Sequence, residues 1–252
     1  MAKRAPLALA FVLLQWVPGA AAQQSTSAPM DMGALDSTDR RALGAAHAAM
    51  SGPMAMDPHM TLTPLRPGRA ADSARAADVV AQMRVALDKY HDVRVAEADG
   101  FRQFLPQVPQ PIYHFTNWRW ALEEMFRFDP AKPTALLYRR DPDGRFVLVG
   151  AMYTAPVRAS LDALDRRIPL AVARWHQHVN WCVPPRGARE RWRETRAGQP
   201  VFGPKSPIAT AAACSAVGGR FRPHIFGWMV HVMAFASADP TVIWSEGHHP
   251  HS

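Results

Sequence analysis

The sequence predicts an α+β domain whose core is a mainly antiparallel β-sheet, with an N-terminal amphipathic helix and short helices packed on that sheet. Three features support this fold class. Apolar residues recur at helical spacing within residues 73–99. The turn sequence DPDG at 141–144 separates two apolar runs, as in a β-hairpin. Apolar and polar residues alternate around His176 and again around His231, which is typical of strands.

A first helix is expected over residues 73–99, with Ser73 as its N-cap and Gly100 as its stop. The apolar side chains at one helical spacing are Val79, Met83, Leu87 and Tyr90. The elements expected after it are a strand over 112–116, a helix capped by Asn117 and ending near 126, hairpin strands over 134–140 and 146–153, a helix over 160–166, a strand over 175–182, a helix over 209–217 and a strand over 226–233.

The first 72 residues are expected to lie outside this domain. Residues 1–22 combine two basic residues, an apolar run and a small-residue box, which is the pattern of a secretory signal peptide. Residues 23–72 are rich in Met, Ala and Pro and show no apolar period, which predicts a disordered leader. A metal-binding α+β domain then covers residues 73–245, and residues 246–252 form a His-rich tail.

The signal peptide predicts a periplasmic or extracellular protein. After the signal, no stretch approaches the roughly 20 apolar residues that a membrane span requires, so no span is expected. The formal net charge is +8, but the basic residues are scattered singly or in pairs. A nucleic-acid-binding protein would carry a denser basic stripe, so no nucleic-acid partner is expected.

Cys182 and Cys214 are the two cysteines of the sequence. In an oxidising compartment an even pair predicts one disulfide. The alternative is that Cys182 is a thiolate ligand of a metal ion, because a strand would place it on the same face as His176 and His178.

Four histidines are candidate metal ligands. Side chains alternate along a strand, so His176 and His178 share one face while Trp175 and Trp181 share the other. His231 lies on the polar-bearing face of a second apolar strand, and His114 lies in a third strand. Neutral imidazoles that converge from rigid strands can bind Zn, Cu, Fe or Ni.

Copper is favoured over zinc as the one transition-metal ion bound. Met229 and Met233 share a face with His231 and are candidate auxiliary ligands. The leader also interleaves methionines with His47 and His59, and soft thioethers suit Cu(I) in an exported protein. Methionine as simple apolar filler is the alternative, both in the leader and on the strand.

These patterns predict an exported protein that binds, delivers or sequesters a metal ion. A secreted metalloenzyme, hydrolytic with zinc or oxidative with copper, would use the same histidines and a small-molecule substrate. Its acid or base candidates are Glu123, Glu124 and Tyr153, although a solvated helix face explains the two glutamates more simply and a core position explains Tyr153. Whether the protein is an enzyme stays open.

A metal-free envelope domain is the third hypothesis. Its tryptophans would form a core or a ligand-stacking surface, and they are Trp118, Trp120, Trp175, Trp181 and Trp228.

Overall fold

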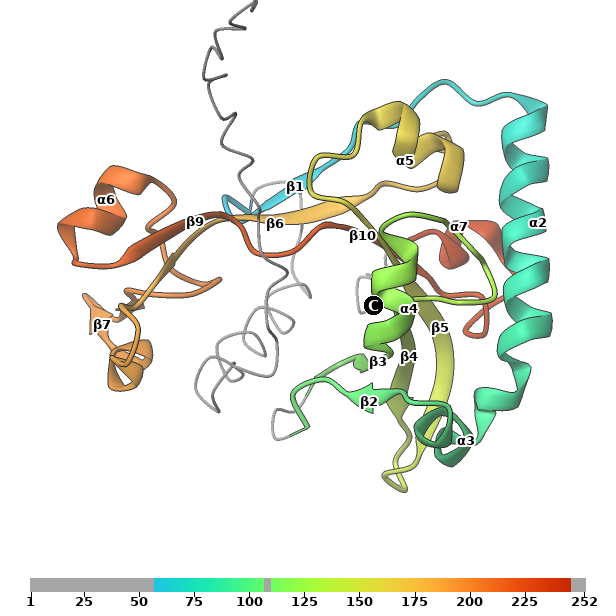
Figure 1. The fold of residues 1–252 in the computed structure, drawn as a ribbon, viewed down its shortest axis with the longest axis horizontal. Coiled ribbons are helices and arrows are strands. Elements are labelled where there is room, and N and C mark those ends of the chain that lie inside the picture. Colours follow the sequence, from blue (N-terminus) through green and yellow to red (C-terminus); the bar gives the residue numbers. More distant parts are fainter. Residues whose placement is uncertain (1–56, 107–109, 246–252) are drawn as a thin grey trace, which may run out of the picture. The chain divides into compact units, whose positions relative to one another are not determined.

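The computed structural model describes residues 57–106 and 110–245 (Figure 1). The predicted signal peptide, most of the predicted leader and the His-rich tail lie outside the described residues. The described chain combines helices with an antiparallel sheet, so the α+β class is confirmed. Within these residues, no helix is both long enough and apolar enough to cross a bilayer.

The described helices are α2 (Ala70–Leu87), α3 (Val93–Ala98), α4 (Trp118–Glu124), α5 (Leu161–Arg167), α6 (Ala211–Ala216) and α7 (Pro240–Ile243), with 3-10 turns η3 (Asp88–His91) and η4 (Arg189–Arg193). The strands are β1 (Met60–Leu62), β2 (Arg102–Gln103), β3 (Tyr113–Thr116), β4 (Ala135–Arg140), β5 (Phe146–Ala155), β6 (His176–Val183), β7 (Thr195–Arg196), β8 (Gln199–Pro200), β9 (Arg220–His224) and β10 (Trp228–Val232). The predicted cap Asn117 is confirmed, because its side chain accepts a hydrogen bond from the backbone N–H of Trp120. Ser160, which was expected as the first residue of its helix, caps α5 by accepting from Ala163 N.

The main sheet is antiparallel and has the strand order β1-β6-β10-β5-β4-β3-β2, with β9 paired to the far half of β6. Strands β7 and β8 form a separate hairpin. The hairpin predicted at residues 141–144 joins β4 to β5, and Gly144 takes the positive φ of +79° that this turn requires. The two strands that carry His176 and His231, β6 and β10, are neighbours in the sheet.

Residues 57–72 belong to the fold, which corrects their assignment to the leader. Strand β1 pairs with β6, placing Met60 opposite His178. The backbone N–H of Thr63 donates to Trp175 O at 2.8 Å, and its hydroxyl accepts from Trp175 N at 3.0 Å. A three-residue strand is too short to show the alternation that identifies strands in a sequence, so only its pairing with β6 reveals it.

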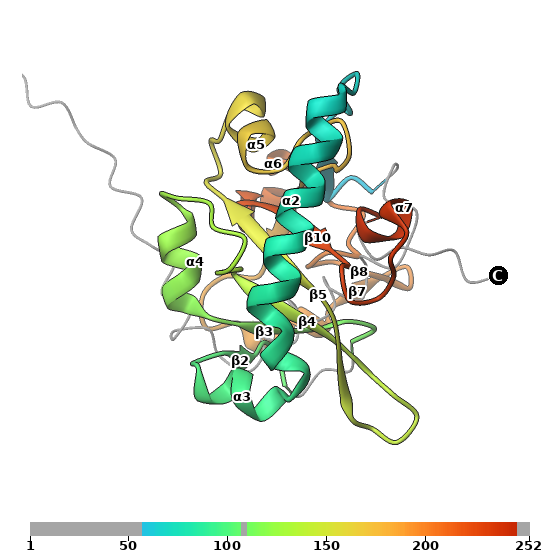
Figure 2. The same ribbon diagram turned by 90° about the vertical axis from the view of Figure 1, so that its right-hand side faces the viewer.

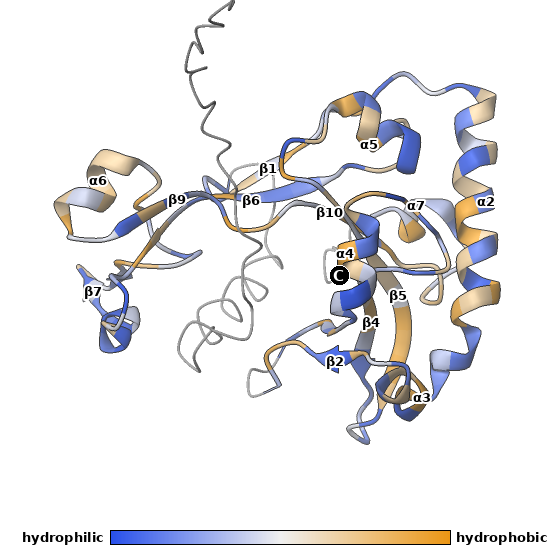
Figure 3. Ribbon diagram, in the orientation of Figure 1, coloured by the Kyte–Doolittle hydropathy of each residue, from blue (hydrophilic) through white to orange (hydrophobic). Residues whose placement is uncertain are grey.

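The expected single helix over 73–99 is two helices. Helix α2 begins at Ala70 and ends at Leu87, and η3 turns the chain before α3. Asp92 starts α3 because its extended backbone breaks the helix and its carboxylate accepts from Arg94 N. Figure 3 shows both hydrophobic and hydrophilic residues along α2, and the buried ones, Ala76, Val79, Val80, Met83 and Leu87, recur at helical spacing.

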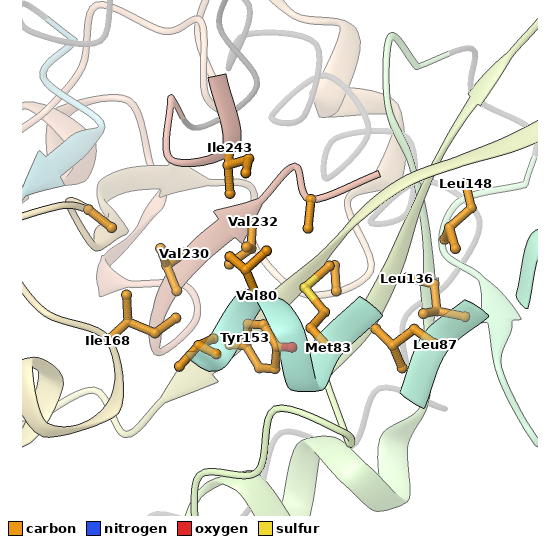
Figure 4. Close-up of a cluster of buried hydrophobic side chains, with 14 of the residues drawn as sticks. Val80, Met83, Leu87, Leu136, Leu148, Tyr153, Ile168, Val230, Val232 and Ile243 are labelled. Carbon is orange, nitrogen blue, oxygen red and sulfur yellow. The ribbon is translucent and has the colours of Figure 1, made fainter. Parts of the chain in front are cut away.

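Helix α2 packs its apolar stripe on one face of the main sheet (Figures 2 and 4). Val80 and Met83 lie against Tyr153 of β5 and Val230 of β10 in this core, and Leu136 of β4 extends it. These side chains are at most 7% exposed. We call this side of the sheet the core face.

The far half of β6 leads to a second, smaller structural unit around α6 and β9 (Figure 1). Cys182 and Cys214 form a disulfide there, with their Cα atoms 5.4 Å apart, so the predicted pairing is confirmed. The alternative that Cys182 is a thiolate metal ligand is wrong, because its sulfur is bonded to Cys214. Val201 and Phe202 pack around the bridge.

Candidate metal centre

The side of the main sheet opposite α2 carries all four predicted histidines. Residues that lie opposite each other in adjacent antiparallel strands point to the same face. His176 lies opposite Met229, His231 opposite Met152, and His178 opposite Met60. We call this side the His–Met face, after its histidines and the methionines opposite them, which are His114, His176, His178, His231, Met60, Met152 and Met229.

The four imidazoles form a continuous series of ring contacts. The ring centroids of His114 and His231 are 5.4 Å apart, those of His231 and His176 are 5.2 Å apart, and those of His176 and His178 are 5.7 Å apart. Each side chain is at most 3% exposed. The structure therefore brings all four sequence-predicted residues into one buried cluster.

His114 on β3 and His231 on β10 are separated in the sheet by the strands β4 and β5. At the usual spacing this separation is about 14 Å between backbones, yet the two Nε2 atoms are only 3.4 Å apart. On the intervening strands, Leu137 and Gly150 lie in register with His114, and Met152 and Ala135 lie in register with His231, so two of these four residues are small. A Cβ at Gly150 would lie 2.3 Å from Val232 O, so the close approach of β10 to β5 requires glycine here.

His178 is held in its neutral form. Burial lowers the pKa of His178 to about 3, with a smaller contribution from the neighbouring imidazoles of His176 and His231, because like charges would repel. Its Nε2 is buried without a hydrogen-bond partner. Neutral imidazole with a free ring nitrogen is the form that binds metal ions.

A kink in β6 separates the half of the strand that carries His176 and His178 from the half that carries Cys182. Asn180 adopts a left-handed backbone with φ of +59°, a conformation that asparagine tolerates better than most residues. The alternation predicted through residues 175–182 fails at this point. Trp181 was expected to share a face with Trp175, but its ring lies 5.8 Å from the ring of His178.

His59 is a buried residue whose place the sequence did not predict. Its Nδ1 lies 3.0 Å from Asn180 O and its Nε2 lies 2.5 Å from Ser206 O. Both ring nitrogens therefore face backbone oxygens that hold the chain before β1 against the kink in β6. This histidine is a structural anchor and not a candidate ligand.

The two adjacent glutamates of α4 have opposite environments. Glu123 is solvated and pairs with Arg119 and Lys132, as expected. Glu124 is only 1% exposed, which corrects the expectation of a solvated face. Burial raises the pKa of Glu124 to about 8, although Thr134 donates a hydrogen bond to Oε2 at 2.5 Å and favours the carboxylate. A sequence cannot reveal this difference, because it depends on which side of the short helix meets the sheet.

Glu124 lies beside the His–Met face. Its Oε2 also accepts from the hydroxyl of Thr154 at 3.2 Å, and Thr154 is the residue opposite Met229. Tyr153 is a core-face residue whose hydroxyl donates to Pro130 O at 2.7 Å. Of the three acid or base candidates, only Glu124 is both buried and hydrogen-bonded to a residue of the His–Met face, Thr154.

The five tryptophans are mainly core residues. Trp175 and Trp181 are at most 1% exposed, while Trp120 and Trp228 pack partly buried against the core. Trp118 is 49% exposed and is the only one of the five that is largely exposed. These positions are those expected if the tryptophans form a core, and they differ from those expected of a ligand-stacking surface.

The buried methionines include two that the sequence did not single out as strand partners of histidines. Met60 was assigned to the predicted leader and Met152 to the predicted hairpin. The strand register places them opposite His178 and His231. The predicted auxiliary residues Met229 and Met233 are 4% and 1% exposed and pack with Met152 in one cluster.

The histidine cluster would need side-chain rotation to enclose an ion. Within residues 57–106 and 110–245, no three His, Cys, Asp or Glu side chains already form a metal-binding group. Adjacent imidazoles are inclined at 52–79° to one another, so the rings meet edge to face and are not stacked. In comparisons with known proteins, no family model, no curated protein and no solved structure matches this chain.

Proposed function

We propose that the protein is exported and binds one transition-metal ion through the four histidines of the His–Met face, with copper favoured over zinc. Its role would be metal binding, delivery or sequestration. The observation that carries the proposal is the contact of four buried imidazoles, one of which has an unpartnered Nε2. A buried polar group without a hydrogen bond costs about 1–3 kcal/mol, and a metal ion would satisfy it.

The distance between His114 and His231 supports shared coordination. In a tetrahedral site with metal–nitrogen distances of about 2.0–2.1 Å, two ligand nitrogens lie about 3.3–3.4 Å apart. The two Nε2 atoms are separated by 3.4 Å. The same separation suits a hydrogen bond between one protonated and one unprotonated nitrogen. An ion could therefore replace that hydrogen bond with little movement of either ring.

The remaining adjustment concerns His176 and His178. Their backbone positions are fixed by pairing with β1 and β10, so only rotation about side-chain bonds is needed to aim their nitrogens. A side chain moved by about 30° from its preferred rotamer costs about 0.5–1.5 kcal/mol. That cost is small beside the binding energy of a transition-metal ion in a protein site.

Export is supported by two independent features. The first 22 residues have the pattern of a signal peptide. The disulfide between Cys182 and Cys214 is of the kind that forms and persists in oxidising compartments.

Metal binding can be tested on protein purified without an affinity tag. His248, His249 and His251 would first be changed to Ala, so that the tail cannot contribute ligands. In this background we expect one equivalent of copper by elemental analysis. His178→Ala and His231→Ala should each lose it. His91→Ala is the matched control, because His91 lies in η3 with 54% of its side chain exposed. Wild-type stoichiometry in both cluster variants would contradict the proposal.

A metalloenzyme is the second candidate, favoured by Glu124. A carboxyl group that keeps its proton near neutral pH can act as a general acid, and this one lies beside the His–Met face. Metal-loaded protein would be assayed for ester hydrolysis and for phenol oxidation. Activity that requires the metal and is lost in Glu124→Gln, with metal content unchanged, would favour the enzyme over the carrier.

A further inference from the structure

Three of the four histidines of the proposed site have a methionine directly opposite them on the neighbouring strand. The pairs are His178 with Met60, His176 with Met229 and His231 with Met152. Opposite residues in an antiparallel pair have Cβ atoms about 4.5–5.5 Å apart, which is within reach of both side chains. Because each pair shares a face, the thioether and the imidazole project to the same side of the sheet.

The methionines are buried with the histidines. Met60, Met152 and Met229 are 9%, 7% and 4% exposed. Met152 and Met229 pack in one cluster with Met233, and Phe226 covers its side. Met233 follows the end of β10, and its backbone N–H donates to Ile243 O, so it has no histidine opposite it.

The two faces of the sheet use methionine very differently. The core-face cluster has 23 buried residues, of which one, Met83, is a methionine. The small cluster on the His–Met face has six buried residues, of which three are methionines. Apolar filling alone would give no reason for this concentration beside the imidazoles, because Leu, Ile and Val pack a core with better-defined rotamers.

We propose that the thioether sulfurs of Met60, Met152 and Met229 replace part of the imidazole ligand set around a bound Cu(I) ion and make the site selective for Cu(I) over Zn(II) and Cu(II). This inference rests on the proposed function, because it assigns the ion's oxidation state and further ligands to the same site. Thioether sulfur is a soft donor that suits Cu(I), whereas Zn(II) and Cu(II) bind well to imidazole alone.

The charge of the ligands also favours Cu(I) over the divalent ions. Imidazole and thioether donors are all neutral, so they leave the charge of the ion uncompensated. Burying an ion in a medium of low dielectric constant costs free energy that rises with the square of its charge. A monovalent ion is therefore tolerated far better than a divalent one in this buried site.

Methionine-to-leucine substitutions test the inference, because leucine conserves volume and removes the sulfur. We would measure Cu(I) affinity by competition with a chromogenic chelator, and Zn(II) affinity in parallel, for Met60→Leu, Met152→Leu and Met229→Leu. Each should weaken Cu(I) binding about tenfold or more and change Zn(II) binding less than twofold. Met83→Leu is the matched control, since Met83 is a buried methionine on the core face, and both affinities should stay at the wild-type value.

X-ray absorption of the Cu(I)-loaded wild-type protein gives a second measurement that does not depend on the variants folding. Both cysteines are in the disulfide, so a sulfur shell around copper must come from methionine. A shell of nitrogen alone would overturn the inference, and so would a sulfur shell that persists in the triple Leu variant.

The possible failures are distinguishable. Unchanged Cu(I) affinity in the methionine variants, with loss in His178→Ala, would overturn the thioether inference and leave the proposed function intact. A wild-type protein that binds neither ion would overturn both.

Discussion

The two faces of the main sheet are built from the same strands but have opposite chemistry. On the core face, polar groups are few: the hydroxyl of Tyr138 donates to Tyr90 O at 2.7 Å, and the indole Nε1 of Trp175 is buried without a hydrogen-bond partner. On the His–Met face, four imidazoles are buried, and Nε2 of His178 has no hydrogen-bond partner. The comparison teaches that strand alternation separates two kinds of burial. One face buries apolar side chains, and the other buries the imidazoles of the proposed metal site.

Substitutions of two adjacent leucines of β4 test whether the two faces are independent. They should give the largest change in the free energy of unfolding. Leu136 belongs to the core face and Leu137 to the His–Met face, and both are fully buried. Leu136→Ala and Leu137→Ala should each lower the free energy of unfolding by about 2–5 kcal/mol, because each leaves a cavity. Only Leu137→Ala should also weaken metal binding, since Leu137 lies opposite His114. Chemical denaturation and metal titration would measure the two effects.

Equal loss of metal affinity in the two leucine variants would break the comparison. It would mean that the site responds to general destabilisation of the sheet and not to the face on which the cavity lies.

Glu124 provides a pH-dependent test of polar burial beside the His–Met face. Its pKa is about 8 in the folded protein against an ordinary value of 4.5, so the folded state binds more protons between these values. Stability should therefore fall as pH rises from about 5 to 8, by about 2–4 kcal/mol for this group. Glu124→Gln should remove that part of the pH dependence, measured by urea unfolding at both pH values.

Glu123→Gln is the control for this experiment. Glu123 is partly exposed, and its pKa is lowered by its hydrogen bond to Lys132. Its contribution changes below pH 4.5, so this variant should retain the wild-type loss of stability between pH 5 and 8. A flat profile in the wild-type protein would mean that Glu124 is ionised in the folded state.

Replacing a proposed ligand with an apolar residue should give the smallest change in stability. The ring of His178 lies near those of Trp181 and Phe226, which are suitable neighbours for leucine. In metal-free buffer, His178→Leu should leave the free energy of unfolding unchanged or raise it by about 1 kcal/mol, because it removes an unsatisfied polar group. Metal binding should be lost.

A loss of several kcal/mol in metal-free His178→Leu would contradict this expectation. It would show that His178 stabilises the apo fold through its own contacts and that the His–Met face is structural.

Several elements could be predicted because their signals are local. The alternation around His176 and His231, the turn at 141–144 and the cap at Asn117 each depend on a few neighbouring residues. The disulfide followed from residue count and compartment. The break between α2 and α3 was missed, because the apolar spacing continues through Tyr90 while the chain turns.

Other features arise from contacts between distant parts of the chain. β1 exists as a strand through its pairing with β6, and Asn180 is kinked where His59 is anchored to its carbonyl oxygen. Burial of Glu124 depends on how α4 lies against β5. None of these leaves a periodic trace in the sequence.

The sequence by itself determined which residues are chemically able to form a site and which of them share a face within one strand. Side-chain alternation has a fixed period of two, so His176 and His178 must face the same way wherever the strand lies. Only the tertiary structure decided which strands are neighbours and in what register. That register placed Met60 and Met152 opposite histidines, and the close approach of β10 at Gly150 helped bring His231 to His114. Contacts between strands far apart in the chain depend on packing of the whole sheet, which no local pattern encodes.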